Sequence, residues 1–277
     1  MAAASTETAA ARAQLLALNE VSAGYGSFRA LFDVSLSVNL GEAVGVIGPN
    51  GAGKSTLANC VTGYLTPNEG RLRLDGHDLS RAPSHRRARA GISRTFQNLE
   101  LFSSMTVFDN VLTALDAPVA SRVRPAALRQ RKEQVHGMLD LFGIGDQGQL
   151  TVETLSYGTR KLVELARAMV RTPKLLVLDE PAAGLASGEK EHLAARLGDA
   201  LEERGCALLL IEHDMPTVRA LCEHVYVLDA GLMIAQGSFA EIATNPAVIE
   251  AYLGSSRNTA AQQPDPGPEA LEQTDAC

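Results

Sequence analysis

The chain has few cysteines and no long apolar run. Four cysteines among 277 residues show no Cys-x-x-Cys spacing, which is too few for a disulfide framework and is typical of reduced thiols in a cytosol. No apolar stretch approaches the about 18–20 residues that a membrane-spanning helix needs. The first dozen residues lack the basic start and apolar run of a secretory signal. The sequence therefore predicts a protein that neither spans a membrane nor is exported.

An excess of positive charge is also missing. Lys and Arg total 25 against 32 Asp and Glu, a net charge of −7, which disfavours nucleic acid as a partner. The basic residues between 122 and 132 favour a solvated helix face, although they could dock a partner or anionic lipid headgroups. We find no repeat of 20–50 residues and no sustained heptads, which excludes a solenoid or a long coiled-coil arm.

Short apolar runs alternate with segments of helical period, and this pattern predicts an α/β fold. Strands are expected at Ala43–Ile47, Arg71–Leu74, Leu175–Leu178, Ala207–Ile211 and Val225–Leu228. Strand signals vanish between about 103 and 171, where three segments carry apolar residues at helical spacing: Val107–Leu115, Pro125–Leu141 and Arg160–Val170. The polar ends of the chain, residues 1–12 and 255–277, are predicted to be disordered.

A glycine-rich stretch follows the first of these apolar runs and matches G-x-x-x-x-G-K-[ST]. It comprises Gly48, Pro49, Asn50, Gly51, Ala52, Gly53, Lys54, Ser55 and Thr56. In such a loop, backbone N–H groups surround phosphate oxygens, the lysine reaches the β- and γ-phosphates, and the hydroxyl of Ser55 can bind Mg²⁺. The alternative is a plain glycine-rich turn, but the strand before it and the helical pattern after it favour a nucleotide site.

Two carboxylates end another apolar strand, at Asp179 and Glu180. This places both at the carboxyl edge of the sheet, where α/β proteins bind ligands. Asp179 can hold Mg²⁺ through a water molecule, and Glu180 can polarise the water that attacks a γ-phosphate. Alternatively, Glu180 caps the turn that Pro181 forces. The presence of Lys54 favours the catalytic interpretation.

A weaker signal precedes the helical segment that begins near Lys161. Ser156 and Gly158 stand where the helix N-terminus can receive an anion, although a serine before a helix is usually only an N-cap. Its position between the phosphate loop and Asp179 favours anion binding over a plain N-cap role.

With these motifs in this order, the chain resembles the ATP-binding subunits of ABC transporters over about residues 14–254. Leu155-Ser-Tyr-Gly158 is similar to the family signature, which closes on ATP held by a second subunit. Tyr25 resembles the aromatic residue that stacks on adenine, Gln97 the loop residue that joins two subdomains and reaches the metal, and His213 the switch histidine at the γ-phosphate. The resemblance implies bound ATP and Mg²⁺, catalysis by Glu180, His213 and Gln97, and a dimer with two composite sites.

Taken alone, three of these residues have simpler interpretations. Tyr25 could be a turn aromatic, Gln97 a solvated loop residue, and His213 a strand-end histidine satisfied by a neighbour. Order and context favour the family roles. His213 and His224 lack cysteine partners at zinc spacing, so no zinc site is expected.

Within the family, the chain is most similar to the ATPases of branched-chain amino acid, or Liv-type, importers. The similarity rests on Tyr157 in the signature, on Pro181–Leu185 and on the ending Asn245–Gly254. Two positions depart from the pattern: Thr159, where Gln, Glu or Asp is usual, and Ala186, where Asp or Asn normally acts across the dimer. Ala186 cannot form a side-chain hydrogen bond, which affects communication between the ATP sites rather than ATP binding.

The expected architecture is a P-loop NTPase core sheet of ABC type in one domain over residues 13–254. It carries an N-terminal antiparallel β-subdomain near residues 15–45 and 70–80 and a helical subdomain inserted at about residues 98–171. The expected partners are separate transmembrane permease subunits, a second ABC ATPase subunit and, indirectly, an extracytoplasmic solute-binding protein. The expected location is the cytoplasmic face of the cell membrane. Two alternatives stay open: an ATPase for lipid or lipopolysaccharide export or for urea, and a soluble scaffold in iron–sulfur cluster assembly.

Overall fold

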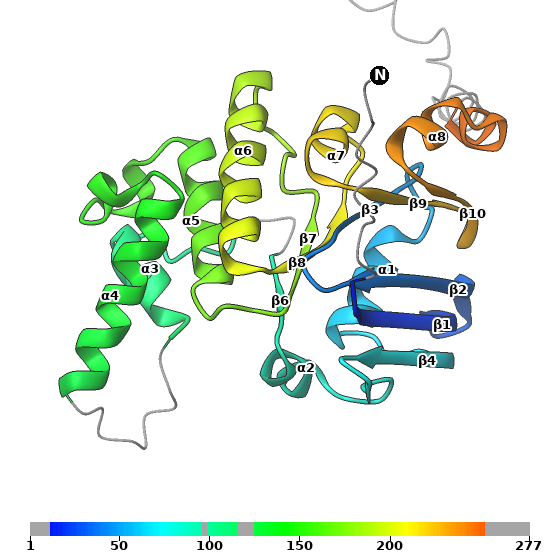
Figure 1. The fold of residues 1–277 in the computed structure, drawn as a ribbon, viewed down its shortest axis with the longest axis horizontal. Helices are drawn as coiled ribbons and strands as arrows, with labels where there is room; N and C mark the ends of the chain where they lie inside the picture. Colours follow the sequence, from blue (N-terminus) through cyan, green and yellow to red (C-terminus); the bar gives the residue numbers. More distant parts are fainter. Residues whose placement is uncertain (1–11, 96–98, 116–124, 253–277) are drawn as a thin grey trace, which may run out of the picture.

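The protein is built around a mixed six-stranded sheet beside a smaller antiparallel sheet (Figure 1). The computed structural model describes residues 12–95, 99–115 and 125–252. The large sheet has the order β10 (Leu232–Gly237), β9 (His224–Asp229), β3 (Ala43–Ile47), β8 (Ala207–Ile211), β7 (Leu175–Asp179) and β6 (Ile92–Arg94). All neighbouring pairs are parallel except β9 and β10. The predicted α/β class is confirmed.

The antiparallel sheet is formed mainly by the N-terminal part of the chain. Its order is β2 (Phe28–Asn39), β1 (Gln14–Tyr25), β4 (Glu69–Leu74) and β5 (His77–Asp78). It falls within the two stretches, near residues 15–45 and 70–80, where the sequence predicts an antiparallel layer.

The apolar runs form strands because the sheet is covered on both faces. Every residue of β7 and β8 is buried, which explains why both read as continuous apolar runs instead of alternating ones. In β8, Leu208 and Leu210 pack into one hydrophobic cluster, whereas Leu209 and Ile211 pack into the other. The predicted strands at 43–47 and 207–211 coincide with β3 and β8.

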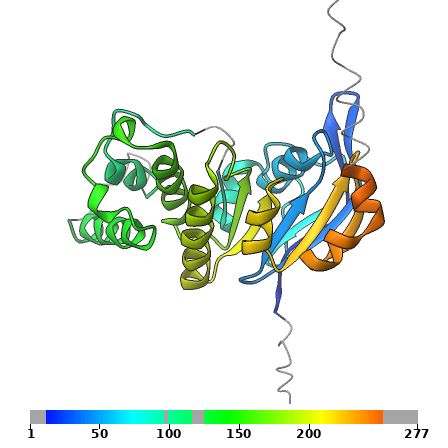
Figure 2. The same ribbon diagram turned by 90° about the horizontal axis from the view of Figure 1, so that it is seen from above.

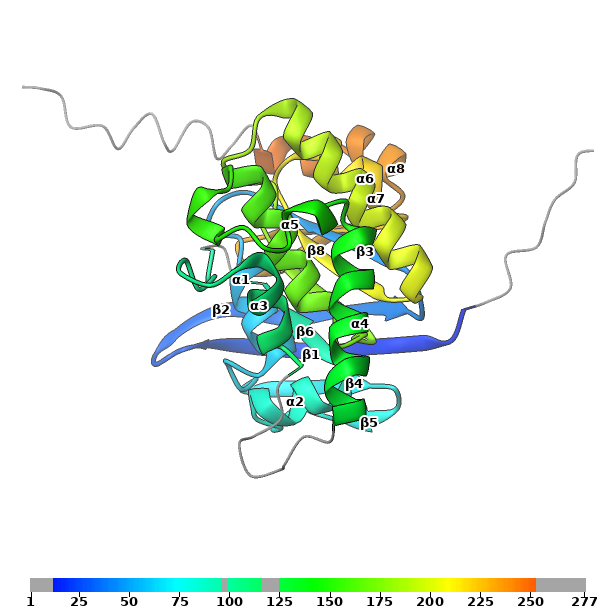
Figure 3. The ribbon, with the colours of Figure 1, turned by 90° about the vertical axis from the view of Figure 1, so that its left-hand side faces the viewer.

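Helices cover the large sheet and extend beyond one of its ends. They are α1 (Lys54–Thr62), α2 (Ser84–Ala90), α3 (Val107–Thr113), α4 (Pro125–Leu141), α5 (Tyr157–Met169), α6 (Ser187–Arg204), α7 (Met215–Leu221) and α8 (Phe239–Thr244). Helices α3, α4 and α5 gather at the end of the molecule away from the antiparallel sheet (Figures 1 and 2), and α4 runs along the outside of this group (Figure 3). In the described parts of residues 103–171, the only β pairing is the isolated bridge between Thr106 and Thr151.

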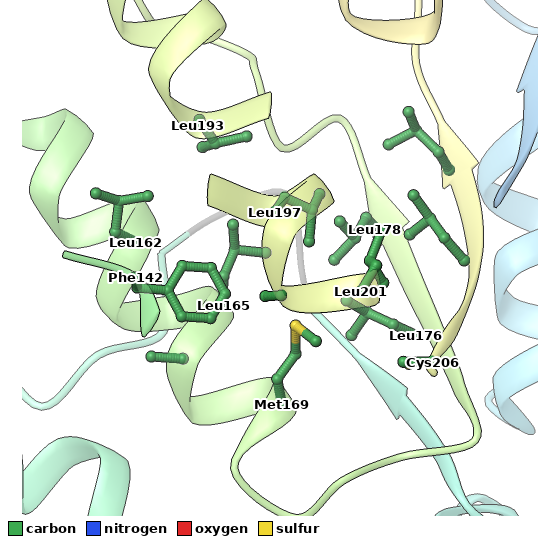
Figure 4. Packing of buried hydrophobic residues seen from close by; sticks show 14 of the residues in the cluster. Phe142, Leu162, Leu165, Met169, Leu176, Leu178, Leu193, Leu197, Leu201 and Cys206 are labelled. Carbon is green, nitrogen blue, oxygen red and sulfur yellow. The ribbon is translucent and has the colours of Figure 1, made fainter. Parts of the chain in front are cut away.

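One hydrophobic cluster joins this helical end to the large sheet. The leucines Leu193, Leu197 and Leu201 of α6 lie between α5 and the strand β7 (Figure 4). Because α6 packs on both, the helices and the sheet share one core. Over the described ranges, no helix combines the length and apolarity needed to cross a bilayer.

Candidate nucleotide site

The register of three parallel strands brings the sequence motifs to one edge of the large sheet. Ile211 of β8 pairs with Val46 of β3 on one side and with Asp179 of β7 on the other. Since parallel strands end at the same edge, the glycine-rich loop, Glu180 and His213 all emerge there.

The glycine-rich loop has its shape because two glycines approach other backbone segments closely. A Cβ at Gly48 would lie 2.1 Å from the carbonyl oxygen of Leu228, and one at Gly53 would lie 2.7 Å from that of Ala30. Gly53 also has a φ of 99°. Any larger residue at these positions would push the loop away from the sheet.

Lys54 is held inside this loop. Its Nζ donates hydrogen bonds to the carbonyl oxygens of Gly48 at 2.7 Å and Pro49 at 3.0 Å. Burial lowers the pKa of Lys54, and the charges of Glu180, Asp179 and Glu212 oppose that shift. The loop therefore contains a buried ammonium group on which three carboxylates act.

The start of α1 is open to an anion. Gly53 is the N-cap residue, and as a glycine it has no side chain to accept a capping hydrogen bond there. Gly51 and Ser55 are exposed, whereas Ala52 and Thr56 are buried. Unpaired N–H groups at a helix N-terminus suit a phosphate, so the predicted loop has the form that phosphate binding requires.

Asp179 is buried and paired with an arginine. Nη2 of Arg94 donates to its Oδ2 at 3.1 Å. Burial raises the pKa of Asp179, and the charge of Arg94 opposes the increase. A poorly solvated carboxylate of this kind gains from a nearby cation.

Glu180 lies in an unusual backbone conformation. Its φ is +50°, a region that residues other than glycine rarely adopt. Its N–H donates to the carbonyl oxygen of Ile211 at 2.8 Å. Its carboxylate Oε1 lies 3.6 Å from Nδ1 of His213, whose side chain is 56% exposed. The structure thus brings the predicted base and the predicted switch histidine side by side.

Tyr25 ends β1 and connects to Asp179 through two residues that the sequence did not single out. Its ring is half exposed, and its hydroxyl accepts a hydrogen bond from Nδ2 of Asn59 at 2.7 Å. Oδ1 of Asn59 accepts from Nη1 of Arg94 at 2.6 Å, and Arg94 pairs with Asp179. No local sequence pattern pointed to this chain of contacts. Gln97 itself lies outside the described residues.

The predicted signature lies at the start of α5. Ser156 is the N-cap residue, and its Oγ accepts a hydrogen bond from the N–H of Thr159 at 3.2 Å. A Cβ at Gly158 would lie 2.7 Å from Oε1 of Glu189. Helix α5 belongs to the helical end, whereas α1 lies beside the sheets (Figure 1).

A third carboxylate, which the sequence motifs do not single out, also lies at this edge of the sheet. Glu212 follows β8 directly and is fully buried. The signal was available in the sequence, because an acid at the end of an apolar strand is the feature that points to Asp179.

The comparison with known families decides the identity. A family model for the ABC transporter matches residues 31–183. The chain belongs to this family. A second model, for the branched-chain amino acid ATP-binding cassette transporter, matches residues 233–257. Proteins of the ABC family hydrolyse ATP, so this chain is an ATPase that binds ATP.

Relatives in the ABC family cover nearly all of the chain. It is 37% identical over 251 residues to the high-affinity branched-chain amino acid transport ATP-binding protein BraF of Pseudomonas aeruginosa, covering 87% of this chain and 98% of that protein. It is 36% identical over 255 residues to the corresponding protein LivG of Escherichia coli, with the same coverage. It is 33% identical over 240 residues to the lipopolysaccharide export system ATP-binding protein LptB of Haemophilus influenzae, covering 87% of this chain and 97% of that protein.

Solved structures of ABC cassettes share the fold. An ATP-binding cassette of an ABC transporter in its ADP conformation superposes with a TM-score of 0.77 at 33% identity, covering 87% of this chain and 99% of that one. A nucleotide-free cassette gives 0.75 at 32% identity, with 86% and 98% covered.

Proposed function

We propose that this chain is the ATP-hydrolysing subunit of an ABC importer for branched-chain amino acids or related small polar solutes. The main support is the branched-chain family model that matches residues 233–257, beyond the part common to ABC transporters. The high coverage of BraF and LivG points the same way.

In this proposal, the glycine-rich loop binds the phosphates of ATP. Residues 48–56 supply N–H groups and the α1 N-terminus, and Lys54 leaves its carbonyl acceptors for the β- and γ-phosphates. Tyr25 turns its exposed ring face to adenine. The loop's glycines and the buried ammonium group support this assignment.

Mg²⁺ is the metal that this donor set suits. Ser55 and Gln97 would supply neutral oxygen ligands and Asp179 would hold the ion through water, which fits a cation that prefers oxygen donors and keeps waters. The poor solvation of Asp179 favours a cation beside it. When bound, Mg²⁺ neutralises charge on the phosphates.

Hydrolysis depends on Glu180 and His213. We assign to Glu180 the orientation of the attacking water and to His213 a contact with the γ-phosphate, with Gln97 completing the site. Ser156 and Gly158 act on the nucleotide of a second subunit, through the N-terminus of α5. Their separation from α1 within one chain supports a composite site.

The partners follow from this assignment. They are separate transmembrane permease subunits, a second ABC ATPase subunit in a homo- or heterodimer, and indirectly an extracytoplasmic solute-binding protein, with no nucleic acid involved. The chain would act peripherally, at the cytoplasmic face of the cell membrane.

Glu180→Gln tests the catalytic assignment. The amide keeps the size of the side chain but loses the charge that orients water, so we expect ATP turnover to fall by at least about 100-fold while ATP affinity is retained. Lys54→Ala should instead weaken ATP binding itself, measured by titration with and without Mg²⁺. Wild-type turnover by Glu180→Gln would remove Glu180 from the mechanism.

Uptake of labelled leucine tests the transport assignment. Cells that lack the gene should lose uptake, and wild-type protein but not Glu180→Gln should restore it. The similarity to LptB favours lipid export as the second candidate. Unchanged leucine uptake, together with permeases for lipopolysaccharide in the purified complex, would favour that candidate. Uptake of labelled urea, measured in parallel, tests the urea alternative. If the protein never fractionates with membranes, the soluble scaffold in iron–sulfur cluster assembly would be favoured instead.

A further inference from the structure

Glu212 is a fully buried carboxylate whose partners are backbone N–H groups. Oε1 accepts a hydrogen bond from the N–H of Ala182 at 2.9 Å. Oε2 accepts from the N–H groups of His213 at 2.9 Å and Asp214 at 3.1 Å. Hydrogen bonds from several N–H groups stabilise a carboxylate in the absence of solvent.

These three bonds join two loops at the candidate site. Ala182 belongs to the loop after β7 that carries Glu180, whereas His213 and Asp214 belong to the loop after β8. Oε2 of Glu212 also lies 3.7 Å from the imidazole Nδ1 of His213. One side chain therefore contacts the backbone of both loops.

The same strand end fixes the conformation of Glu180. Its own N–H donates to Ile211, and the N–H of Ala182, two residues on, donates to Glu212. A residue other than glycine keeps a positive φ only when its surroundings determine it. Ile211, the last residue of β8, and Glu212, which follows it, thus hold the turn that orients the Glu180 side chain.

We propose that Glu212 is a positioning residue that holds Glu180 and His213 in one arrangement and so controls the rate of ATP hydrolysis without touching the nucleotide. The inference rests on the roles proposed above for Glu180 and His213. It predicts that loss of Glu212 lowers kcat far more than it changes the affinity for ATP. None of the phosphate-binding residues hydrogen-bonds to Glu212 in the described chain, and its charge alone acts on Lys54.

Glu212→Gln is the direct test. The amide keeps the shape but has one oxygen, so its NH₂ group must face at least one of the three backbone N–H donors. We expect kcat for Mg-ATP hydrolysis by the full chain to fall about 10- to 100-fold, as small misplacements of catalytic groups do. KM and the Kd for ATP should change far less than kcat. Glu212→Asp, which keeps the charge that acts on Lys54, should leave both within about twofold of wild type.

Asn110→Asp is the matched control. Asn110 in α3 is also fully buried, and its amide bonds to the backbone of Phe102 and Thr106. The substitution replaces the amide donor to the carbonyl oxygens of Phe102 and Thr106 by a buried carboxylate oxygen, so it should lower thermal stability at least as much as Glu212→Gln while kcat is retained. An equal loss of kcat in Asn110→Asp would show that destabilisation alone explains the effect and would overturn the proposal.

Amide hydrogen exchange gives a readout that does not depend on activity. Exchange at Ala182, His213 and Asp214 should accelerate in Glu212→Gln and stay slow in Asn110→Asp. In a His213→Ala background, Glu212→Gln should add less than its separate effect, because contacting residues are coupled. If Glu212→Gln does not fold, Glu212→Asp keeps the charge with a shorter reach, and it should lower kcat with KM unchanged.

The outcomes separate this inference from the proposed function. If Glu180→Gln and His213→Ala keep wild-type turnover, the proposed roles of those residues are wrong. If both lose turnover while Glu212→Gln, or Glu212→Asp in its place, keeps wild-type kcat, only the role of Glu212 is overturned.

Discussion

At the scale of single residues, the candidate site concentrates charge where solvation is poor. Lys54 has a lowered pKa and Asp179 a raised one, both mainly because of burial. Neither group is in the environment that is best for its own charge. In the proposed function, the phosphates of the nucleotide give Lys54 a direct anionic partner and the metal adds a second cation beside Asp179, so binding offsets a cost present in the free protein.

Tyr25 provides a test of the adenine side of the site. Its ring is exposed for stacking, while its hydroxyl is bonded to Asn59. We expect Tyr25→Leu to weaken ATP binding by about 1–3 kcal/mol, as loss of a base–aromatic contact does. Tyr25→Phe keeps the ring and should bind nearly as well, as titration with ATP can measure. Equal affinities of the Leu and Phe variants would contradict stacking and direct attention to exposed Phe28.

The residues of the candidate site could be proposed from the sequence, but their contacts could not. Lys54, Asp179 and His213 stand in short local patterns, and each pattern lies next to a strand. The pairing of Arg94 with Asp179, and of Glu212 with Ala182, depends instead on which strands are neighbours and in what register. No local pattern contains that information.

At the scale of elements, α1 is held at both ends. The glycine-rich loop fixes its N-terminus, and the buried side chain of Arg87 from α2 meets its C-terminus. The guanidinium group donates to the carbonyl oxygens of Cys60 and Val61 in the last turn, and to those of Ser80 and Ala82. A cation at this end also interacts favourably with the negative end of the helix dipole.

Arg87→Met should therefore destabilise the protein. It leaves several buried carbonyl groups without donors, and we expect the free energy of unfolding to fall by about 2–4 kcal/mol, measured by urea denaturation. Arg86→Met is the matched control, since Arg86 is the exposed neighbour on the same helix and its loss should change stability by less than about 0.5 kcal/mol. Equal midpoints for the two variants would contradict the capping role.

The elements that the sequence predicted best are those with the most uniform burial. The bounds of β3 and β8 were predicted correctly because both strands are continuous apolar runs between polar segments. β6 has only three residues, too few for a pattern, and takes its place by pairing with β7. β10 is half-buried at the edge of the sheet and has no strong period.

At the scale of the whole molecule, the two halves of the proposed ATP site lie far apart in one chain, since α1 packs into one hydrophobic cluster and α5 into the other. The phosphate loop starts α1 beside the sheets, and the signature starts α5 at the helical end (Figure 1). Helix α6 packs between the sheet and α5 (Figure 4). A movement of the helical end would therefore reach the sheet through α6. Two chains facing each other could join each phosphate loop to the other chain's signature.

This arrangement predicts a dimer that depends on ATP. In the Glu180→Gln background, where ATP is bound but not hydrolysed, sedimentation with Mg-ATP should reveal a dimer. Gly158→Asp should abolish it, because the new carboxylate would face the γ-phosphate of the partner and would also crowd Glu189, which lies 2.7 Å from the site of its Cβ. The control is Gly137→Asp, which adds the same charge at an exposed position of α4 with no atom within 4 Å of the new Cβ.

The two substitutions add the same charge, but only Gly158→Asp approaches the proposed interface, and it also crowds Glu189. Gly137→Asp should therefore dimerise as the parent does, and thermal melting should show that both variants are folded. ATP affinity of the monomer should be the same in both, because Gly158 does not contact the nucleotide of its own chain in this arrangement. A stable dimer of Gly158→Asp with unchanged ATP affinity would mean that the signature lies outside the interface, and the composite site would then have to be abandoned for this chain.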